Sequence, residues 1–258
     1  MIIQHVKVYS NRCVASQMYE LVLNTDIPEF LPGQFIQLYL AGRSSFFMPR
    51  PFSIYKLKNG QLSILYKIYG KATLEISQLN PGDSIKMWGP LGNSFSLDKN
   101  IHRAMIAGGV GIPPIVALAE SVQNLGGHTT VFIGGRTKAD IICIEALKAV
   151  GAEIQIATND GSMGFAGFVT DLFKERIHIF EKIYACGPKP MEKVVAHLAV
   201  DHHIACELSM EEVMACGIGI CVGCVVPVKD GDSFTFKKLC SDGPVIKADC
   251  LALEKMEW

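Results

Sequence analysis

The order of hydrophobic and polar residues divides the chain into three stretches. From residue 1 to about 98, short runs rich in Val, Ile, Tyr and Phe are separated by turn signals such as Pro32-Gly33, Asn59-Gly60 and Pro81-Gly82. About six short strands are predicted, at 6–10, 18–24, 34–40, 51–57, 61–69 and 83–89. Short strands joined by local turns are typical of a closed antiparallel barrel.

Near Arg103 the pattern changes to strands that are each followed by a helix. Apolar strands at 103–109, 129–135, 153–160 and 182–187 precede helices expected at 113–125, 140–150, 169–175 and 190–200. Because parallel strands need crossover helices, these units predict a small parallel sheet. From about Ile204 the chain is rich in Gly and Cys, and we expect this segment to need a bound group in order to fold. The predicted domains are residues 1–98, 99–205 and 206–258.

The composition narrows the possible partners. Of 258 residues, 24 are Lys or Arg and 25 are Asp or Glu, whereas nucleic-acid binders usually carry a strong basic excess. We therefore expect no nucleic-acid partner, and a small molecule or another protein instead. Charged residues make up only 19% of the chain, which suggests that another subunit covers part of the surface.

No segment has the pattern of a membrane anchor or an export signal. The longest uncharged apolar run, Ala104 to Ala119, is interrupted by glycines and prolines and is shorter than the ~20 residues that span a bilayer. The N-terminus alternates like a strand and lacks the charged start and apolar run of a signal peptide. We therefore expect no membrane contact and a cytoplasmic protein.

Four of the nine cysteines fall close together, at Cys216, Cys221, Cys224 and Cys240. Their C-x4-C-x2-C...C spacing is that of plant-type [2Fe-2S] centres. The glycines between them allow the backbone to turn its N–H groups toward the sulfurs. A structural zinc site is the alternative, but zinc ribbons usually use two short CxxC pairs and this segment has one. The spacing favours an iron-sulfur cluster.

Two motifs in the predicted barrel have residue types that suit phosphate groups. In MPRPFS, a proline-flanked Arg50 offers a planar fork to a pyrophosphate, and Ser53 could hydrogen-bond a ring edge. A helix beginning after Gly70 could bind another phosphate oxygen through its first N–H groups and Thr73. Either motif alone is weak, since an Arg at a strand end is more often solvated. Together they favour a dinucleotide.

A third motif, AGGVGIPP, joins a predicted strand to a helix at residues 107–114. Gly108, Gly109 and Gly111 would let a pyrophosphate approach the backbone at the carboxyl edge of the parallel sheet, where nucleotides bind. The last predicted strand ends at the same edge with Cys186, where a nicotinamide could lie against a flavin. The alternatives are a tight turn without a ligand and a small residue in a crowded turn.

These motifs, with GPLG at 89–92 and the Gly-rich stretch at 158–170, make the chain resemble the ferredoxin-NADP reductase superfamily. The tail, SMEEVMACGIGICVGCVVPV with KLCSDGPV, is similar to a narrower group, the electron-transfer subunits of NAD-dependent class 1B dihydroorotate dehydrogenases. The resemblance covers essentially the whole chain. It implies a β + α/β fold with an antiparallel FAD-binding β-barrel, a parallel-sheet NAD-binding domain and a small C-terminal [2Fe-2S] domain.

The resemblance also implies which residues bind the cofactors. The metal ligands would be the four tail cysteines, and NAD would lie on the α/β domain, at the edge that carries the three glycines and Cys186. Relatives often have Gly at the position of Ala72, so close approach of a phosphate there is less secure. Arg136 could accommodate a 2'-phosphate, but we favour NAD over NADP. The implied FAD residues are Arg50, Pro51, Phe52, Ser53, Lys67, Ile68, Tyr69, Ala72 and Thr73.

The implied function is electron transfer in pyrimidine biosynthesis. Dihydroorotate would be oxidised in a separate FMN-containing catalytic subunit, expected to form a heterotetramer with this chain, because a flavin-bearing TIM barrel needs about 250 residues of its own. Electrons would pass through the [2Fe-2S] cluster and FAD to NAD+, with no general acid or base in this chain. The alternatives are an NAD(P)H oxidoreductase subunit serving a hydrogenase, sulfide dehydrogenase or ferredoxin, and a zinc-stabilised scaffold without a redox role.

Overall fold

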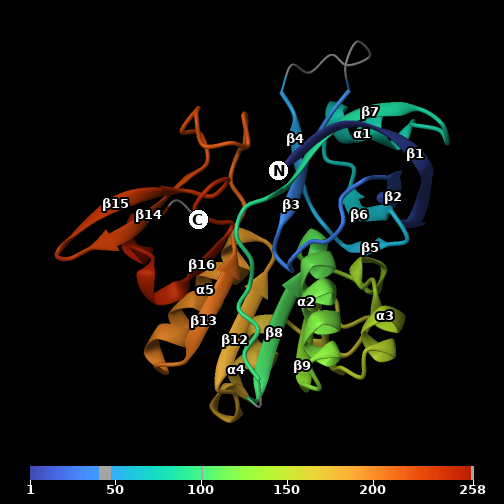
Figure 1. Cartoon of the computed structure of the whole chain (residues 1–258). Coiled ribbons are helices and arrows are strands. Elements are labelled where there is room, and N and C mark those ends of the chain that lie inside the picture. The colour runs from blue at the N-terminus through green and yellow to red at the C-terminus, as the bar shows by residue number, and fades with distance from the viewer. Residues whose placement is uncertain (41–47, 100, 257–258) are drawn as a thin grey trace.

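The computed structural model describes residues 1–40, 48–99 and 101–256. Within these residues the first part of the chain forms a seven-stranded antiparallel sheet that curls into a barrel (Figure 1). The strand order is β4-β3-β7-β1-β2-β6-β5. The two edge strands, β4 and β5, are separated along the chain only by Ile54 and Tyr55, so the barrel nearly closes. The elements are β1 (Ile2–Ala15), β2 (Met18–Asn24), β3 (Phe35–Tyr39), β4 (Arg50–Ser53), β5 (Lys56–Lys58), β6 (Gln61–Lys67), α1 (Lys71–Ser77) and β7 (Ser84–Leu91).

The predicted barrel is confirmed, with one strand more than expected. The stretch 51–57 forms two short strands, β4 and β5, because the chain turns at Ile54 and Tyr55 to join the other edge of the sheet. Leu21, Leu23 and Ile36 are fully buried inside the barrel. Alternate residues of each strand face this core, as the period of a half-buried strand requires.

The second part of the chain is a sheet whose order is β11-β10-β9-β8-β12-β13-β16. Its strands pair in parallel, except for β16, which pairs antiparallel to β13 at the edge. Helices follow the strands at the four predicted places. The elements are β8 (Arg103–Gly108), α2 (Ile112–Asn124), β9 (Thr129–Gly135), α3 (Ile144–Ala149), β10 (Glu153–Thr158), β11 (Phe165–Ala166), α4 (Val169–Lys174), β12 (Lys182–Cys186), α5 (Lys189–Asp201), β13 (Ala205–Ser209) and β16 (Val245–Lys247).

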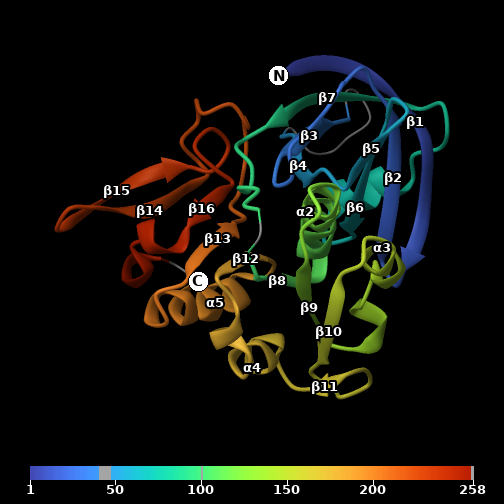
Figure 2. The same ribbon diagram turned by 60° about the horizontal axis from the view of Figure 1, so that its bottom comes forward.

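Helices cover both faces of this sheet (Figure 2). In β8, Ala104 and Ile106 join the core beneath α4 and α5, whereas Met105 and Ala107 join the core beneath α2 and α3. Both faces are buried, so the strand reads as a continuous apolar run rather than an alternating one. The carboxyl ends of the strands point toward the barrel (Figure 1).

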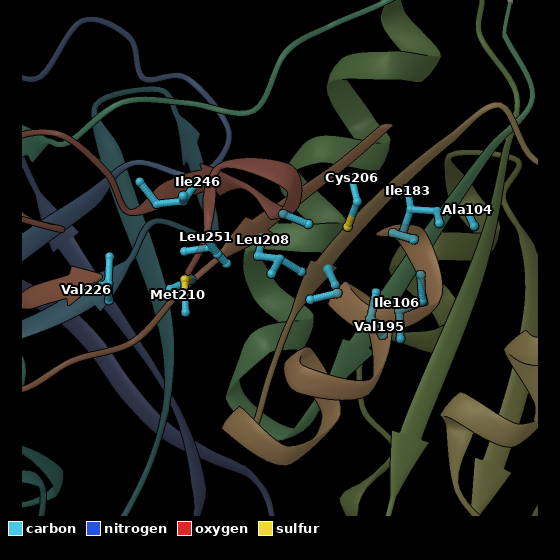
Figure 3. Close-up of a cluster of buried hydrophobic side chains, with 14 of the residues drawn as sticks. Ala104, Ile106, Ile183, Val195, Cys206, Leu208, Met210, Val226, Ile246 and Leu251 are labelled. Carbon is cyan, nitrogen blue, oxygen red and sulfur yellow. The ribbon is translucent and has the colours of Figure 1, made fainter. Parts of the chain in front are cut away.

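The sheet continues past residue 205, where the sequence predicts a domain boundary. β13 is a further parallel strand beside β12, and β16 returns to it from near the C-terminus. Figure 3 shows Cys206, Leu208 and Met210 of this region in one apolar cluster with Ile246 and Leu251. The sequence signal of β13 is weak because a charged residue, Glu207, lies at its centre. Glu207 is buried and pairs with Lys182 at 3.0 Å.

The rest of the tail extends from this sheet. β14 (Val225–Asp230) and β15 (Ser233–Lys238) form a hairpin that projects from the body of the molecule (Figure 1). Between β13 and β14 runs the cysteine loop, which we define as residues 211–224 and which contains no helix or strand although all of it is described. Among the described residues, no helix is both long and apolar enough to cross a bilayer.

Candidate functional site

A cavity of about 560 Å³ lies between the barrel, the carboxyl edge of the parallel sheet and the tail. Its barrel wall is formed by β4 and by the segment from the end of β6 into α1. The sheet contributes Val110 and Cys186, and the tail contributes Pro244 and, from the stretch before the first cysteine, Ser209, Met210, Glu211, Glu212 and Met214. Eight of the nine predicted FAD residues line this cavity, namely Arg50, Pro51, Phe52, Ser53, Lys67, Tyr69, Ala72 and Thr73.

Arg50 places a cation on the barrel wall of the cavity. Its Nη1 donates hydrogen bonds to the carbonyl oxygens of Met48 and Pro49, both at 3.1 Å, which hold the guanidinium against the start of β4. Phe52 packs edge-on against Tyr66, with ring centroids 5.8 Å apart. An anchored guanidinium beside aromatic surface suits a ligand that carries both a pyrophosphate and a flat ring system.

Lys67 connects the barrel wall to the parallel sheet. Its Nζ lies 3.3 Å from Oδ1 of Asp140, which follows β9. Burial opposes ionisation of Asp140, but the Thr137 N–H and Lys67 outweigh it and lower the pKa of this carboxyl. Lys67 therefore lies on the cavity wall as part of an ion pair between two regions of the chain.

The other residues of this segment have different surroundings. The Thr73 hydroxyl accepts hydrogen bonds from the N–H groups of Tyr69 and Gly70, at 2.9 and 3.2 Å, so it stabilises the first turn of α1. Ala72 is buried, and the Tyr69 ring is 74% exposed at the rim of the cavity. Ile68, the ninth predicted residue, is absent from the lining as far as the described residues show, and its N–H donates to Gln17.

The three glycines of the AGGVGIPP motif lie at the carboxyl edge of the sheet, beside the cavity. Of the described residues in this motif, only Val110 lines the cavity itself. A Cβ at Gly111 would lie 2.1 Å from the carbonyl oxygen of Cys186, so this glycine lets α2 begin directly against the end of β12. A Cβ at Gly108 would lie 3.0 Å from Cδ of Pro188, whereas Gly109 has a φ of +56° and faces open space. The motif brings Cys186 and Val110 together at one edge.

The four predicted metal ligands meet in the cysteine loop and the turn after β15. The Cys216 Sγ accepts hydrogen bonds from the N–H groups of Ile218 and Cys221, both at 3.4 Å, and the Cys240 Sγ accepts one from Gly219 at 3.1 Å. Lys238 adds a positive charge, because its Nζ donates to the Gly219 carbonyl at 3.1 Å. Backbone N–H groups and a cation around sulfur stabilise thiolates and any anionic group that they hold.

The four thiols interact with one another. Cys216 interacts with Cys221, and Cys240 interacts with Cys224 and with Cys216. In the part of the chain that the structure describes, no three His, Cys, Asp or Glu side chains converge as ligands of a single ion. A [2Fe-2S] centre needs two thiolates on each of two irons, whereas a structural zinc ion needs four ligands around one point. Four cysteines that, within the described chain, do not converge on one point fit the cluster better than zinc.

The pKa values of two of these thiols move in opposite directions. Burial raises the pKa of Cys216, but hydrogen bonds from the N–H groups of Cys221 and Ile218 outweigh it and lower the pKa to about 6. Burial, with the neighbouring Cys224 thiol, raises the pKa of Cys240 to about 12. Thiolates are the form that binds iron, so Cys216 is prepared for a metal in the free chain, and Cys240 becomes a ligand only by losing its proton to the metal.

The tail wall of the cavity is the part that sequence reasoning missed. Ser209, Met210 and Glu211 line the cavity, followed by Glu212 and Met214. Glu211 is exposed where it lines this wall. Met214 precedes Cys216 by two residues, which places their Cα atoms within ~7 Å of each other. The sequence signal that could have pointed to this wall is the stretch SMEEVM, which ends two residues before Cys216.

Comparison with known proteins places this arrangement in a family. Residues 211–252 match the iron-sulfur cluster binding domain of dihydroorotate dehydrogenase B, and residues 105–197 match the oxidoreductase NAD-binding domain. The electron transfer subunit of dihydroorotate dehydrogenase B (NAD(+)) from Caldanaerobacter subterraneus is 35% identical over 243 residues, which cover 94% of this chain and 96% of that protein. The chain belongs to the family of electron-transfer subunits of dihydroorotate dehydrogenase B. The predicted resemblance is thereby confirmed.

Other relatives of this electron-transfer subunit agree. The Geobacillus kaustophilus electron transfer subunit is 38% identical over 252 residues, covering 95% of this chain and 96% of that protein. Among solved structures, an NADH-dependent reduced ferredoxin-NADP oxidoreductase matches 97% of this chain and 90% of its own, with 26% identity and a TM-score of 0.87. A ferredoxin reductase of carbazole 1,9a-dioxygenase shares the fold, with 21% identity, a TM-score of 0.69 and coverage of 79% of this chain and 66% of that one.

Proposed function

We propose that this electron-transfer subunit works through two adjoining sites, an FAD site in the cavity and a [2Fe-2S] site in the cysteine loop. The family function is electron transfer in NAD-dependent dihydroorotate oxidation, a step of pyrimidine biosynthesis. The observation that carries the proposal is the shared wall, because Met214 lines the cavity and lies two residues before Cys216. When bound, the cluster supplies one-electron transfer, and FAD links it to hydride transfer with NAD+.

The barrel wall and the sheet edge hold and orient the flavin and the nicotinamide. Arg50 supplies charge and N–H donors for the pyrophosphate, and β4 and Tyr66 supply apolar surface beside Ser53. Lys67 keeps the barrel wall in place against the sheet through Asp140. Gly111 lets the backbone pass close to Cys186, and Gly109 leaves open space, at the edge where NAD would lie. None of these roles requires a general acid or base.

The cysteine loop holds the cluster at the surface. Cys216, Cys221, Cys224 and Cys240 would supply the four thiolates that the two irons need. Lys238 and the N–H groups of Ile218 and Gly219 offset the negative charge that the thiolates bring. Cys224 and Cys240 are buried, whereas Cys221 is exposed, so the loop presents one side to the outside.

The partner is a separate FMN-containing catalytic subunit, and we propose that two copies of each chain form a heterotetramer. The cysteine loop exposes several apolar side chains: Val213 is 79% exposed, Ile220 75% and Val222 58%. Exposed apolar surface of this kind suits association with another protein. The catalytic subunit would cover this side and bring its flavin near Cys221. We further propose a cytoplasmic complex, because free cysteines suit a reducing compartment.

Cys221→Ser in the reconstituted complex tests this function. The variant should lose at least ~100-fold of its dihydroorotate-dependent NAD+ reduction, since it removes an iron ligand. It should retain NADH oxidation by an artificial two-electron acceptor, because the FAD cavity does not include Cys221. Cys250→Ser, at an exposed cysteine outside the four, is the matched control and should leave both activities unchanged. An unchanged dihydroorotate-dependent rate in Cys221→Ser would show that the proposed route is wrong.

A second candidate function keeps the architecture and changes the partner. The structural match to the NADH-dependent reduced ferredoxin-NADP oxidoreductase spans 97% of this chain, so a ferredoxin, hydrogenase or sulfide dehydrogenase subunit could occupy the same side of the cysteine loop. Purification with the native partner distinguishes the two. Recovery of a dihydroorotate-oxidising flavoprotein supports the first function, and recovery of a hydrogenase or ferredoxin-type partner supports the second.

A further inference from the structure

A buried glutamine lies where the barrel meets the cysteine loop. Gln37 is in the middle of β3 and is 0% exposed. Its Cα is paired with Pro51 of β4, which lines the cavity, and with Trp88 of β7. Gln37 thus stands directly behind the barrel wall of the proposed FAD site.

The side chain of Gln37 points at the cysteine loop. A Cβ built at Gly217 would lie 2.5 Å from its Nε2, 2.8 Å from its Cγ and 3.0 Å from its Cδ. Gly217 has a φ of +70° and directly follows Cys216. Only a glycine allows the loop to pass this close to the amide. The contact fixes where the Cys216 end of the loop rests on the barrel.

The amide of Gln37 has no partner in the described part of the chain. Neither Nε2 nor Oε1 makes a hydrogen bond, and both atoms are buried. A buried unpaired amide is costly, and native proteins rarely keep one without a function. Ile36 and Leu38 beside it are packed into the barrel core, so an apolar residue would fit the strand equally well. A polar group at this position therefore calls for a polar ligand.

We propose that Gln37 positions its NH2 group to donate a hydrogen bond to sulfur when the cysteine loop holds the cluster. This hydrogen bond would raise the reduction potential of the cluster. This inference rests on the proposed [2Fe-2S] site. Hydrogen bonds to cluster sulfurs stabilise the reduced, more negative form, and their number is one of the terms that set the potential. Gln37 would join the N–H groups of Ile218 and Gly219 in this role, but from the barrel that carries FAD.

The test is a redox titration of the cluster, followed by its EPR signal, in the whole chain with Gln37→Leu. We expect the midpoint to shift to lower potential and the EPR spectrum of the reduced cluster to change. The ligand-free variant should be at least as heat-stable as the native chain, because the unpaired amide is gone. A merely structural role would change stability and leave the potential unaltered.

Gln34→Leu is the matched control. Gln34 lies three residues away, but its amide is already bonded to the Leu31 N–H and the Gly92 carbonyl, at 2.9 and 3.1 Å. Its cluster should titrate like that of the native chain. Loss of the cluster from a folded Gln37→Leu chain, with retention in Gln34→Leu, would also support the inference. An unchanged potential and spectrum in Gln37→Leu would overturn it. A native chain without iron and sulfide would instead contradict the proposed function itself.

Discussion

The parallel sheet and the cysteine loop are built on different principles. In the sheet, β8 and β12 are buried on both faces and bonded to neighbours on both sides, so the fold is fixed by the burial of its own residues. In the loop, apolar side chains such as Val213 and Ile220 face outward, and backbone N–H groups point at sulfur instead of at carbonyl oxygens. The conformation of the loop therefore suits a ligand bound by its cysteines, whereas the sheet folds without a ligand.

Removing iron should produce the largest difference between the two regions. Chelation takes away the bonds that replace secondary structure in residues 211–224, so protease cleavage there should become about tenfold faster or more, while the sheet stays protected. Limited proteolysis with mass spectrometry of the fragments measures this. Equal protection of the loop with and without iron would contradict the claim that the loop depends on a bound ligand.

The FAD cavity should depend on the barrel and not on the cluster. Arg50→Ala removes a charge-assisted hydrogen-bond donor and should weaken FAD binding about 10- to 100-fold, because such bonds contribute about 1.5–3 kcal/mol. Cys221→Ser should bind FAD like the native chain. Flavin fluorescence titration of the two apoproteins measures both FAD affinities. A loss of FAD affinity in Cys221→Ser but not in Arg50→Ala would contradict the placement of FAD in the cavity at the barrel.

A substitution inside the packed sheet edge should destabilise the chain without any ligand. Gly111→Ala places a Cβ 2.1 Å from the Cys186 carbonyl oxygen, so the free energy of unfolding should fall by about 1–3 kcal/mol. Gly70→Ala is the control, since a Cβ there meets no atom within 4 Å. Urea denaturation of the ligand-free variants gives both numbers. Equal stability of the two variants would refute the close packing inferred at Gly111.

The smallest effect is expected at the ion pair between Asp98 and Lys182, where β12 begins. A hydrogen bond from Lys182, 2.6 Å away, lowers the pKa of Asp98 below its usual 3.8. A carboxyl whose pKa is lower in the folded state than in the unfolded state stabilises the fold at pH values above its unfolded pKa. This stabilisation is lost as the pH falls through its folded pKa. Asp98→Asn should therefore cost less than about 1 kcal/mol at pH 7, because Asp98 is partly exposed, and progressively less as the pH falls below the usual carboxyl pKa. Thermal melts across this pH range would show it.

The sequence predicted those elements and sites that are marked by the spacing of apolar residues, turn residues or cysteines along the chain. β2 has its expected bounds, and the helices from Ile112 and Val169 begin within one residue of prediction, because apolar periodicity and Pro or Gly mark them. The four cysteines predicted from their spacing lie in the cysteine loop and in the turn after β15. The place of SMEEVM on the cavity wall and the contact of Gln37 with the cysteine loop could not be predicted in this way, because both arise only when segments distant in sequence pack together.

Analysis of anaerobically purified chain for iron, acid-labile sulfide and flavin tests the central claim most directly. The account predicts a yellow-brown protein with equal amounts of iron and sulfide, two of each per FAD, and loss of the iron but not the FAD in Cys221→Ser. A colourless protein that holds one zinc ion at the four cysteines would contradict it.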